Sequence, residues 1–437
     1  MSIEKMNAMN GVPCACGKAH TFAADVVVGK GVVVRIPHFI RKFRAEKPFV
    51  LSDVNTYEAA GRQVCQILED SGIPYRSYSF PSTALEPDEH SVGSAMMHFD
   101  TGCDIIIGVG SGVINDIGKI LSNISGKPYI IVGTAPSMDG YASASSSMTR
   151  DGLKISLPSR SADVIIGDTD ILCQAPMHMM KAGLGDMIAK YVSICEWRIS
   201  HLITGEYYCE EVAQLIRSAL KRCTDNAAGL LQRDEAAVQA VFEGLVIGGV
   251  AMNYAGLSRP ASGVEHYISH VLDMRGAEFG IPVDLHGIQC AVGTVIATAL
   301  YEKIKAITPD REKALAYAAA FRKEDWFAQL RQLLGKGAES MIALEAKEGK
   351  YDVESHKKRL EVILEHWDEI LQIMGEELPS CEALNALMDT IEAPKTLSEI
   401  GVDEEMLPII FRATKDIRDK YVLSRLAWDL GVLDEIV

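Results

Sequence analysis

The sequence predicts an α/β N-terminal domain with a parallel sheet, followed by an all-α C-terminal domain. Up to about residue 174, short apolar runs rich in β-branched residues alternate with helical patterns. Beyond that point long amphipathic segments follow one another, and strand-like runs almost disappear. A chain of 437 residues is also too long for one ordinary core. We therefore expect two domains, residues 1–174 and 175–437, with the active site in the cleft between them.

The expected elements follow from these patterns in chain order. In the first domain we expect strands at 48–53, 75–80, 103–108, 129–132 and 164–166, with helices at 57–71 and 87–99. In the second domain we expect helices at 177–200, 206–231, 235–254, 266–274, 286–307, 311–335 and 354–374. The acidic stretch 345–369 is expected to be a solvated helix face, and the sequence assigns no role to the C-terminal extension after about Glu345.

Composition excludes several classes of partner. The net charge is −16 and no basic block is present, which argues against nucleic-acid binding. No apolar run reaches eighteen residues and the N-terminus lacks the apolar core of a signal peptide, so neither a membrane span nor secretion is expected. Ten scattered cysteines are typical of thiols in a reducing cytoplasm.

Cys14, Cys16 and His20 are three soft ligands within seven residues, but a distant fourth ligand is not evident, so we favour a structural turn over a zinc site.

A glycine turn follows the expected strand at 103–108. The segment 108–112 reads Gly-Val-Gly-Ser-Gly and leads into a helix, where backbone N–H groups can bind a pyrophosphate. This reading makes the first domain a Rossmann-like dinucleotide-binding domain, although a plain strand-to-helix turn explains the glycines equally well. Asp53, at the end of an earlier strand, could bind a ribose hydroxyl and so favour NAD(H) over NADP(H). Its alternative role is a helix N-cap.

The loop 134–143 is unusually polar for a connection after a buried strand. It carries hydroxyls, a carboxylate and a glycine within ten residues. Dense polar loops at the carboxyl ends of strands are frequently functional, so we prefer a functional loop over a structural turn.

One aspartate and two of three closely spaced histidines form a candidate metal site. His266 and His270 are four residues apart, which places both imidazoles on one helix face, and His286 follows directly before a glycine. Asp186 lies in an apolar stretch beside two glycines, where a carboxylate needs a cation, a role open to a metal or to Lys190. Asp186, His266 and His286 would leave one coordination position open, as catalytic sites require. The alternative for Asp186 is a helix N-cap.

With these pieces in this order, the chain resembles the sn-glycerol-1-phosphate dehydrogenases. These belong to the superfamily of glycerol dehydrogenase, iron-containing alcohol dehydrogenases and 3-dehydroquinate synthase. The resemblance covers most of the chain from about Asp53, and its most specific parts are the segments 137–143 and 259–266. The glycine turn is less glycine-rich than in the family, and the spacing from His266 to His286 is longer than in archaeal relatives.

The resemblance implies a set of site residues. Asp139 would contact substrate, Asp186 would bind both metal and substrate, and His270 would lie beside the substrate hydroxyls. The cofactor would be contacted, together with the glycine turn and Asp53, by Gly110, Ser111, Gly112, Val113, Ile114, Asn115, Asp116, Thr134, Ala135, Pro136, Ser137 and Ser143.

The expected reaction is the NAD(P)H-dependent reduction of dihydroxyacetone phosphate to sn-glycerol 1-phosphate, in the cytoplasm and by a homodimer. The metal would be zinc, nickel or iron, which Asp-His-His ligation does not distinguish. His270 is the expected proton relay, and Arg259 is a candidate partner for the substrate phosphate, with a surface salt bridge as its alternative. The competing functions are a polyol dehydrogenase for unphosphorylated substrates, a dehydroquinate synthase-like lyase and a regulatory protein on the same scaffold.

Overall fold

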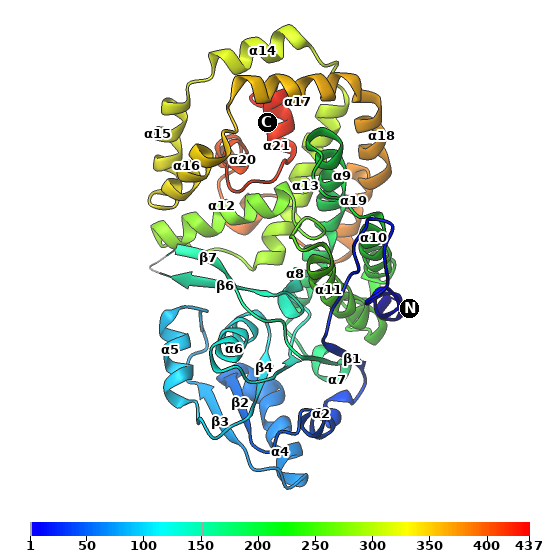
Figure 1. The fold of residues 1–437 in the computed structure, drawn as a ribbon, viewed down its shortest axis with the longest axis vertical. Coiled ribbons are helices and arrows are strands. Elements are labelled where there is room, and N and C mark those ends of the chain that lie inside the picture. Colours follow the sequence, from blue (N-terminus) through cyan, green and yellow to red (C-terminus); the bar gives the residue numbers. More distant parts are fainter. Residues whose placement is uncertain (1, 151–152) are drawn as a thin grey trace. The chain divides into compact units, whose positions relative to one another are not determined.

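The computed structural model describes residues 2–150 and 153–437 and confirms the expected fold class, an α/β part followed by a largely helical part (Figure 1). The chain divides into two compact units that are interleaved in sequence. Unit 1 comprises Met1–Met187 and Gln214–Leu257, and unit 2 comprises Ile188–Ala213 and Ser258–Val437. The helical segment Gln214–Leu257, which comes after the last strand of the sheet, therefore belongs to the α/β unit.

Unit 1 is built on a six-stranded parallel sheet. Its order is β1-β8-β5-β4-β2-β3, with β1 Asp25–Gly29, β2 Pro48–Asp53, β3 Arg76–Phe80, β4 Ile105–Gly110, β5 Tyr129–Gly133 and β8 Val164–Asp168. The chain adds β3 outside β2 and then returns to place β4 on the other side of β2. In open α/β sheets, ligands bind beyond the carboxyl ends of the strands at such a reversal.

Helices cover this sheet, and its central strands are apolar along most of their length. β4, β5 and β8 are buried at every residue, as expected of strands with helices on both faces. One core joins alternate residues of β4, such as Ile105 and Ile107, to α2 (Ile36–Lys42) and α4 (Arg62–Asp70). The other helices of unit 1 are α1 Ser2–Met9, α3 Val54–Thr56, α5 Glu89–His98, α6 Gly112–Ser125, α7 Thr169–Leu172, α8 Met177–Ile188, α11 Glu235–Ala255 and most of α10 Glu210–Asp225.

Some elements of unit 1 were not expected from the sequence. The edge strand β1 is one, and the antiparallel hairpin of β6 (Ser145–Arg150) and β7 (Leu153–Pro158) is another. β6 is rich in serine and has a single apolar residue, so its periodic signal is weak. The expected helix 177–200 is in fact two helices, α8 and α9 (Lys190–Thr204).

Unit 2 is helical, and its C-terminal segment lies in its core. In the view of Figure 1, α20 (Leu407–Thr414) and α21 (Leu423–Asp429) lie among the helices of residues 311–377. Phe411, Trp428, Ile370 and Met374 are buried in this core, so the extension after Glu345 builds the unit. The remaining helices are α12 Val264–Phe279, α13 His286–Lys305, α14 Arg311–Ala320, α15 Lys323–Leu334, α16 Gly337–Glu348, α17 Val353–Glu365, α18 Trp367–Glu377 and α19 Cys381–Thr390.

Helix α11 meets the length and composition of a membrane-spanning helix, and it is the one such helix among the described residues. Its apolar window is 78% buried inside the protein, as in the core helix of a folded domain.

Candidate active site

The glycine turn connects the central strand β4 to α6. Gly110 ends the strand, and a Cβ at Gly110 would lie 2.5 Å from the Ile114 side chain, so the turn tolerates no larger residue there. Ser111 is the N-cap of α6 but its side chain makes no capping hydrogen bond. The first-turn N–H groups of α6 thus receive no side-chain cap, which leaves them suited to an anion such as a pyrophosphate.

Asp53 ends β2, the neighbour of β4, and so stands at the same edge of the sheet as the glycine turn. Its Oδ1 accepts a hydrogen bond from the Thr56 N–H at 2.8 Å, and Thr56 Oγ1 accepts one from the Asp53 N–H at 2.9 Å. Asp53 is therefore an N-cap in a capping box. Its contact with a ribose stays a prediction.

The polar loop 134–143 follows β5, which pairs with β4 on the side opposite to β2. Hydrogen bonds within the loop and from α6 hold it in place. Tyr141 donates a hydrogen bond from its hydroxyl to the Ala135 carbonyl at 2.7 Å. Asn115 Nδ2 donates to the Gly140 carbonyl at 3.0 Å. The buried Lys119 ammonium donates to the same carbonyl and to Ser143 Oγ, both at 3.3 Å. Lys119 thus holds the loop in place, although it was not predicted from the sequence to be a site residue.

Asp186 contacts this loop from α8. It lies inside that helix, so its alternative role as an N-cap is wrong, and its Oδ2 accepts a hydrogen bond from the Asp139 N–H at 2.9 Å. Asp186 is fully buried, whereas Asp139 is half-buried. The structure therefore brings Asp139 and Asp186 together.

A glycine makes this approach of α8 possible. A Cβ at Gly183 would lie 1.8 Å from the carbonyl oxygen of Pro136, a backbone atom that no side-chain rotation can move away. Two glycines, Gly183 and Gly185, precede Asp186 in the sequence. The close packing of α8 against the loop explains Gly183.

In unit 2 the three predicted histidines gather between α12 and α13. The ring centroids of His266 and His286 are 5.1 Å apart, and those of His270 and His286 are 6.2 Å apart. The two helices pack closely because Gly293 of α13 lies against the backbone of Glu265, where a Cβ would approach the carbonyl oxygen to 2.7 Å.

A buried carboxylate orients the first of these histidines. Glu265 Oε1 accepts a hydrogen bond from His266 Nδ1 at 2.8 Å and another from the Gly263 N–H at 2.7 Å. When Nδ1 donates to the carboxylate, the lone pair of Nε2 is left available to a metal. A histidine backed by a carboxylate in this way is the usual arrangement of a metal ligand. The residues present thus fit a divalent metal.

Two further residues at the histidines were not predicted from the sequence. Ser269 Oγ lies 2.9 Å from His286 Nδ1, and Cys290 Sγ lies 3.6 Å from His286 Nε2. The candidate ligand atoms of His266, His286 and Cys290 all lie within 4.8 Å of one another. Burial alone would raise the pKa of the Cys290 thiol, but the two histidines outweigh it and lower the pKa. The spacing from His286 to Cys290, one helical turn, is the sequence signal that could have revealed it.

Arg259 has protein partners in unit 2. Its side chain is 1% exposed and donates to both carboxylate oxygens of Glu206 at 2.9 Å and to the Tyr421 carbonyl at 2.8 Å. It also donates to Ser200 Oγ at 3.0 Å. These contacts give Arg259 a structural role in a buried network.

Comparison with known proteins identifies the family to which this chain belongs. Residues 27–176 match the family model of iron-containing alcohol dehydrogenases. The chain is 33% identical over 294 residues to a glycerol-1-phosphate dehydrogenase of Halalkalibacterium halodurans, covering 66% of this chain and 74% of the relative. It is 26% identical to the same enzyme of Bacillus licheniformis, covering 96% and 93% of the two chains.

Solved structures agree on the fold. The structure of glycerol dehydrogenase from Schizosaccharomyces pombe aligns with a TM-score of 0.60 at 18% identity, covering 96% of this chain and 91% of that one. The NADH-dependent butanol dehydrogenase A of Thermotoga maritima aligns with a TM-score of 0.59 at 15% identity, covering 96% and 98%. The chain belongs to the glycerol-1-phosphate dehydrogenase family and is an NAD(P)-dependent dehydrogenase.

Proposed function

We propose that the protein reduces dihydroxyacetone phosphate to sn-glycerol 1-phosphate with NADH or NADPH, and catalyses the reverse reaction. The observation that carries the proposal is the close approach of His266, whose ring contacts the Glu265 carboxylate, to His286, in a chain whose relatives are named glycerol-1-phosphate dehydrogenases. The polar loop held by α6 and α8 is the second support, because it offers substrate contacts at the carboxyl edge of the sheet.

The dinucleotide binds at the carboxyl ends of β2, β4 and β5. The glycine turn and the first turn of α6 receive the pyrophosphate, and the start of the loop after β5, together with Ser143, contacts the rest of the cofactor. The Asp53 carboxylate repels a 2′-phosphate and so favours NADH over NADPH. The cofactor supplies the hydride.

Asp186, His266 and His286 hold the divalent metal, which is zinc, nickel or iron. When bound, the metal supplies Lewis-acid chemistry at the substrate oxygen. Glu265 keeps the proton on His266 Nδ1 and so keeps Nε2 available for ligation. Asp139 contacts the substrate from the loop.

His270 moves the proton. It lies on α12 one turn beyond His266, is half-buried, and stacks near His286. An imidazole has an ordinary pKa close to neutrality, which suits proton delivery to the C2 oxygen as the ketone becomes an alcohol. The His270→Ala variant should therefore lose turnover and keep its metal.

The experiment follows the loss of NADH absorbance with dihydroxyacetone phosphate, with unphosphorylated dihydroxyacetone and after chelation. Turnover with the phosphorylated ketone that is lost on chelation and restored by metal supports the proposal. Chiral analysis of the product then distinguishes sn-glycerol 1-phosphate from its enantiomer. The matched variants are His270→Ala and His366→Ala, the second a half-buried histidine that forms the C-cap of α17.

Two outcomes would overturn the assignment. Turnover with the unphosphorylated ketone alone would make the protein a polyol dehydrogenase. If the protein binds NADH and metal but turns over neither ketone, the proposed class of substrate is ruled out. The homodimer is tested separately by light scattering.

A further inference from the structure

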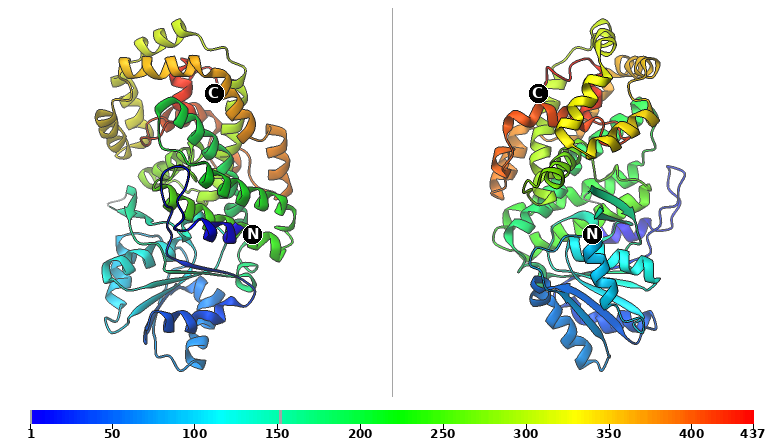
Figure 2. Two further views of the ribbon diagram at one scale, coloured as in Figure 1. Left: turned by 45° about the vertical axis from the view of Figure 1, so that its right-hand side comes forward. Right: turned by 90° about the vertical axis from the view of Figure 1, so that its left-hand side faces the viewer.

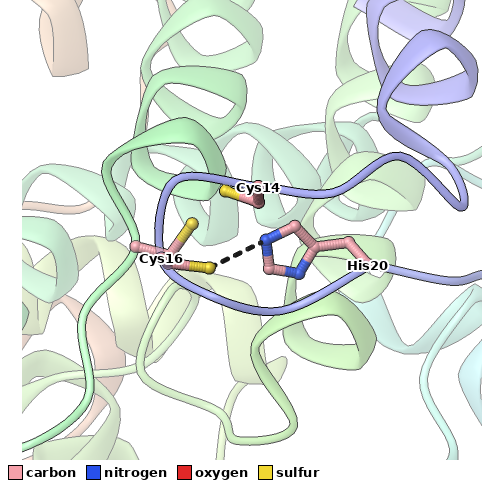
Figure 3. A group of neighbouring side chains, drawn as sticks. Cys14, Cys16 and His20 are labelled. Atoms are coloured by element: carbon pink, nitrogen blue, oxygen red, sulfur yellow. Dashed lines mark hydrogen bonds between the residues drawn. The ribbon is translucent and has the colours of Figure 1, made fainter.

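A second group of metal-ligating side chains lies in the N-terminal loop of unit 1, among residues that the proposed reaction does not use. The N-terminal segment forms α1 and then an open loop before β1 (Figure 2). Figure 3 shows Cys14, Cys16 and His20 pointing toward one another within this loop. Their ligand atoms lie within 4.8 Å of one another, and Cys16 Sγ is 3.5 Å from His20 Nε2.

The backbone of the loop is shaped to bring these side chains together. The Cys14 N–H donates to the Lys18 carbonyl at 2.8 Å, and the Gly17 N–H donates to the Cys14 carbonyl at 2.9 Å. Gly17 has φ +86°, a left-handed conformation that glycine adopts without strain. Pro13 and Ala19 close the turn as an antiparallel bridge. The turn expected from the sequence is present, and it brings two sulfurs and a ring nitrogen to one side.

His20 has the orientation that a metal ligand needs. Its Nδ1 lies 2.8 Å from the carbonyl oxygen of Tyr254 at the end of α11. A carbonyl oxygen only accepts, so Nδ1 carries the proton and the lone pair is on Nε2, the atom directed at Cys16. The ring is 1% exposed and its centroid is 5.4 Å from that of Tyr254, which fixes its direction. A hydrogen bond from the second ring nitrogen to a backbone carbonyl is typical of zinc-bound histidine.

We propose that Cys14, Cys16 and His20 hold a zinc ion with a structural role. Two thiolates and an imidazole select zinc over the harder metals, and the remaining tetrahedral position is filled by a further thiolate or by water. Binding displaces the two thiol protons and changes no oxidation state. The ion fastens the N-terminal loop to the end of α11, where His20 and Lys18 already contact the Tyr254 and Ala255 carbonyls.

Metal counting on the full-length protein tests this site. Elemental analysis of wild type should give one more zinc per chain than the double variant Cys14→Ser/Cys16→Ser or the single variant His20→Gln. Cys173→Ser, a change at a half-buried thiol elsewhere in unit 1, is the matched control and should keep the wild-type count. An equal zinc content in wild type and the double variant, with NADH binding intact in both, would overturn the site.

Cobalt substitution separates this site from the proposed catalytic metal. Co²⁺ bound by thiolates gives an intense sulfur-to-metal charge-transfer band. That band should survive in His286→Ala and be absent from the cysteine double variant. A band lost in His286→Ala and kept in the double variant would assign the thiolate to Cys290 and overturn the N-terminal site. Because the readouts are metal count and spectrum, they hold whether or not the protein reduces dihydroxyacetone phosphate.

Discussion

Glu265 lies directly behind His266, with its Oε1 2.8 Å from Nδ1. The second oxygen, Oε2, is buried and accepts no hydrogen bond from the described residues. A buried carboxylate is costly unless it is balanced by positive charge nearby. A metal ion bound at Nε2 of His266, as proposed above, would supply such charge beside this glutamate.

Glu265→Gln should therefore weaken metal binding. The amide keeps the shape of the carboxylate but removes its charge, and loss of such a partner typically costs about 10- to 100-fold in metal affinity. Titration with a competing chelator measures the change. Glu345→Gln, at another buried carboxyl of unit 2, is the control. Equal affinities in both variants would show that Glu265 does not support a ligand.

Gly183→Ala should disrupt the loop 134–143. The new Cβ would lie 1.8 Å from the Pro136 carbonyl oxygen, so α8 and the loop must separate. Overpacking of this kind costs about 1–3 kcal/mol or more, and NADH binding should fall with it. Gly375→Ala in α18 is the control, since a Cβ there meets nothing within 4 Å and should be neutral or stabilising. Thermal unfolding and NADH fluorescence give the two readouts, and a Gly183→Ala protein as stable as wild type would contradict the packing.

Arg259→Ala should lower stability more than it changes KM. The variant removes the hydrogen bonds to Glu206, Ser200 and the Tyr421 carbonyl, and a hydrogen bond to a charged group contributes about 1.5–3 kcal/mol. Arg62→Ala, which breaks an exposed pair with Glu58, should change little. Denaturant unfolding measures the difference. A raised KM for dihydroxyacetone phosphate at unchanged stability would instead return Arg259 to the substrate site.

The central strands of the sheet were predictable because buried parallel strands are continuous apolar runs in the sequence, whereas the edge strand β1 was not expected. The expected strand at 48–53 matches β2, and the glycine turn lies at the end of β4 as expected. The gathering of His266, His270 and His286 was also expected, since their spacing on two helices is visible in the sequence. The division into domains at residue 174 stays a prediction, as do the ligand roles of the site residues.

Other features depend on contacts between distant segments. Glu265 adjoins His266 on α12 and Cys290 lies one turn after His286 on α13, but only the packing of α12 on α13 brings the candidate ligand atoms of Cys290 and His266 together. Arg259 precedes the histidine helix, which suggested a substrate contact, but its partners Glu206 and Tyr421 are far away along the chain. His20 required the same kind of information, because its orienting carbonyl belongs to Tyr254.

Stability should fall as pH rises from about 5 to 8, in part because of Glu196. Burial, and then the neighbouring Glu265 carboxylate, raise the pKa of Glu196 from 4.5 to about 8. Between these values the folded protein keeps a proton that the unfolded chain has lost, so each rise in pH favours unfolding. The contribution is fully present below pH 4.5 and is lost as pH passes through about 8.

Glu196→Gln removes this titration and should flatten the decline. The amide also loses one acceptor, for the Val264 or the Leu423 N–H, so the variant should be less stable at acidic pH while its dependence on pH is weaker. Denaturant unfolding at a series of pH values measures both effects. Glu312→Gln, at an exposed carboxyl in α14, should keep the wild-type slope. Parallel pH profiles for wild type and Glu196→Gln would mean that Glu196 is ionised in the folded protein throughout, with its charge held by the two backbone N–H groups.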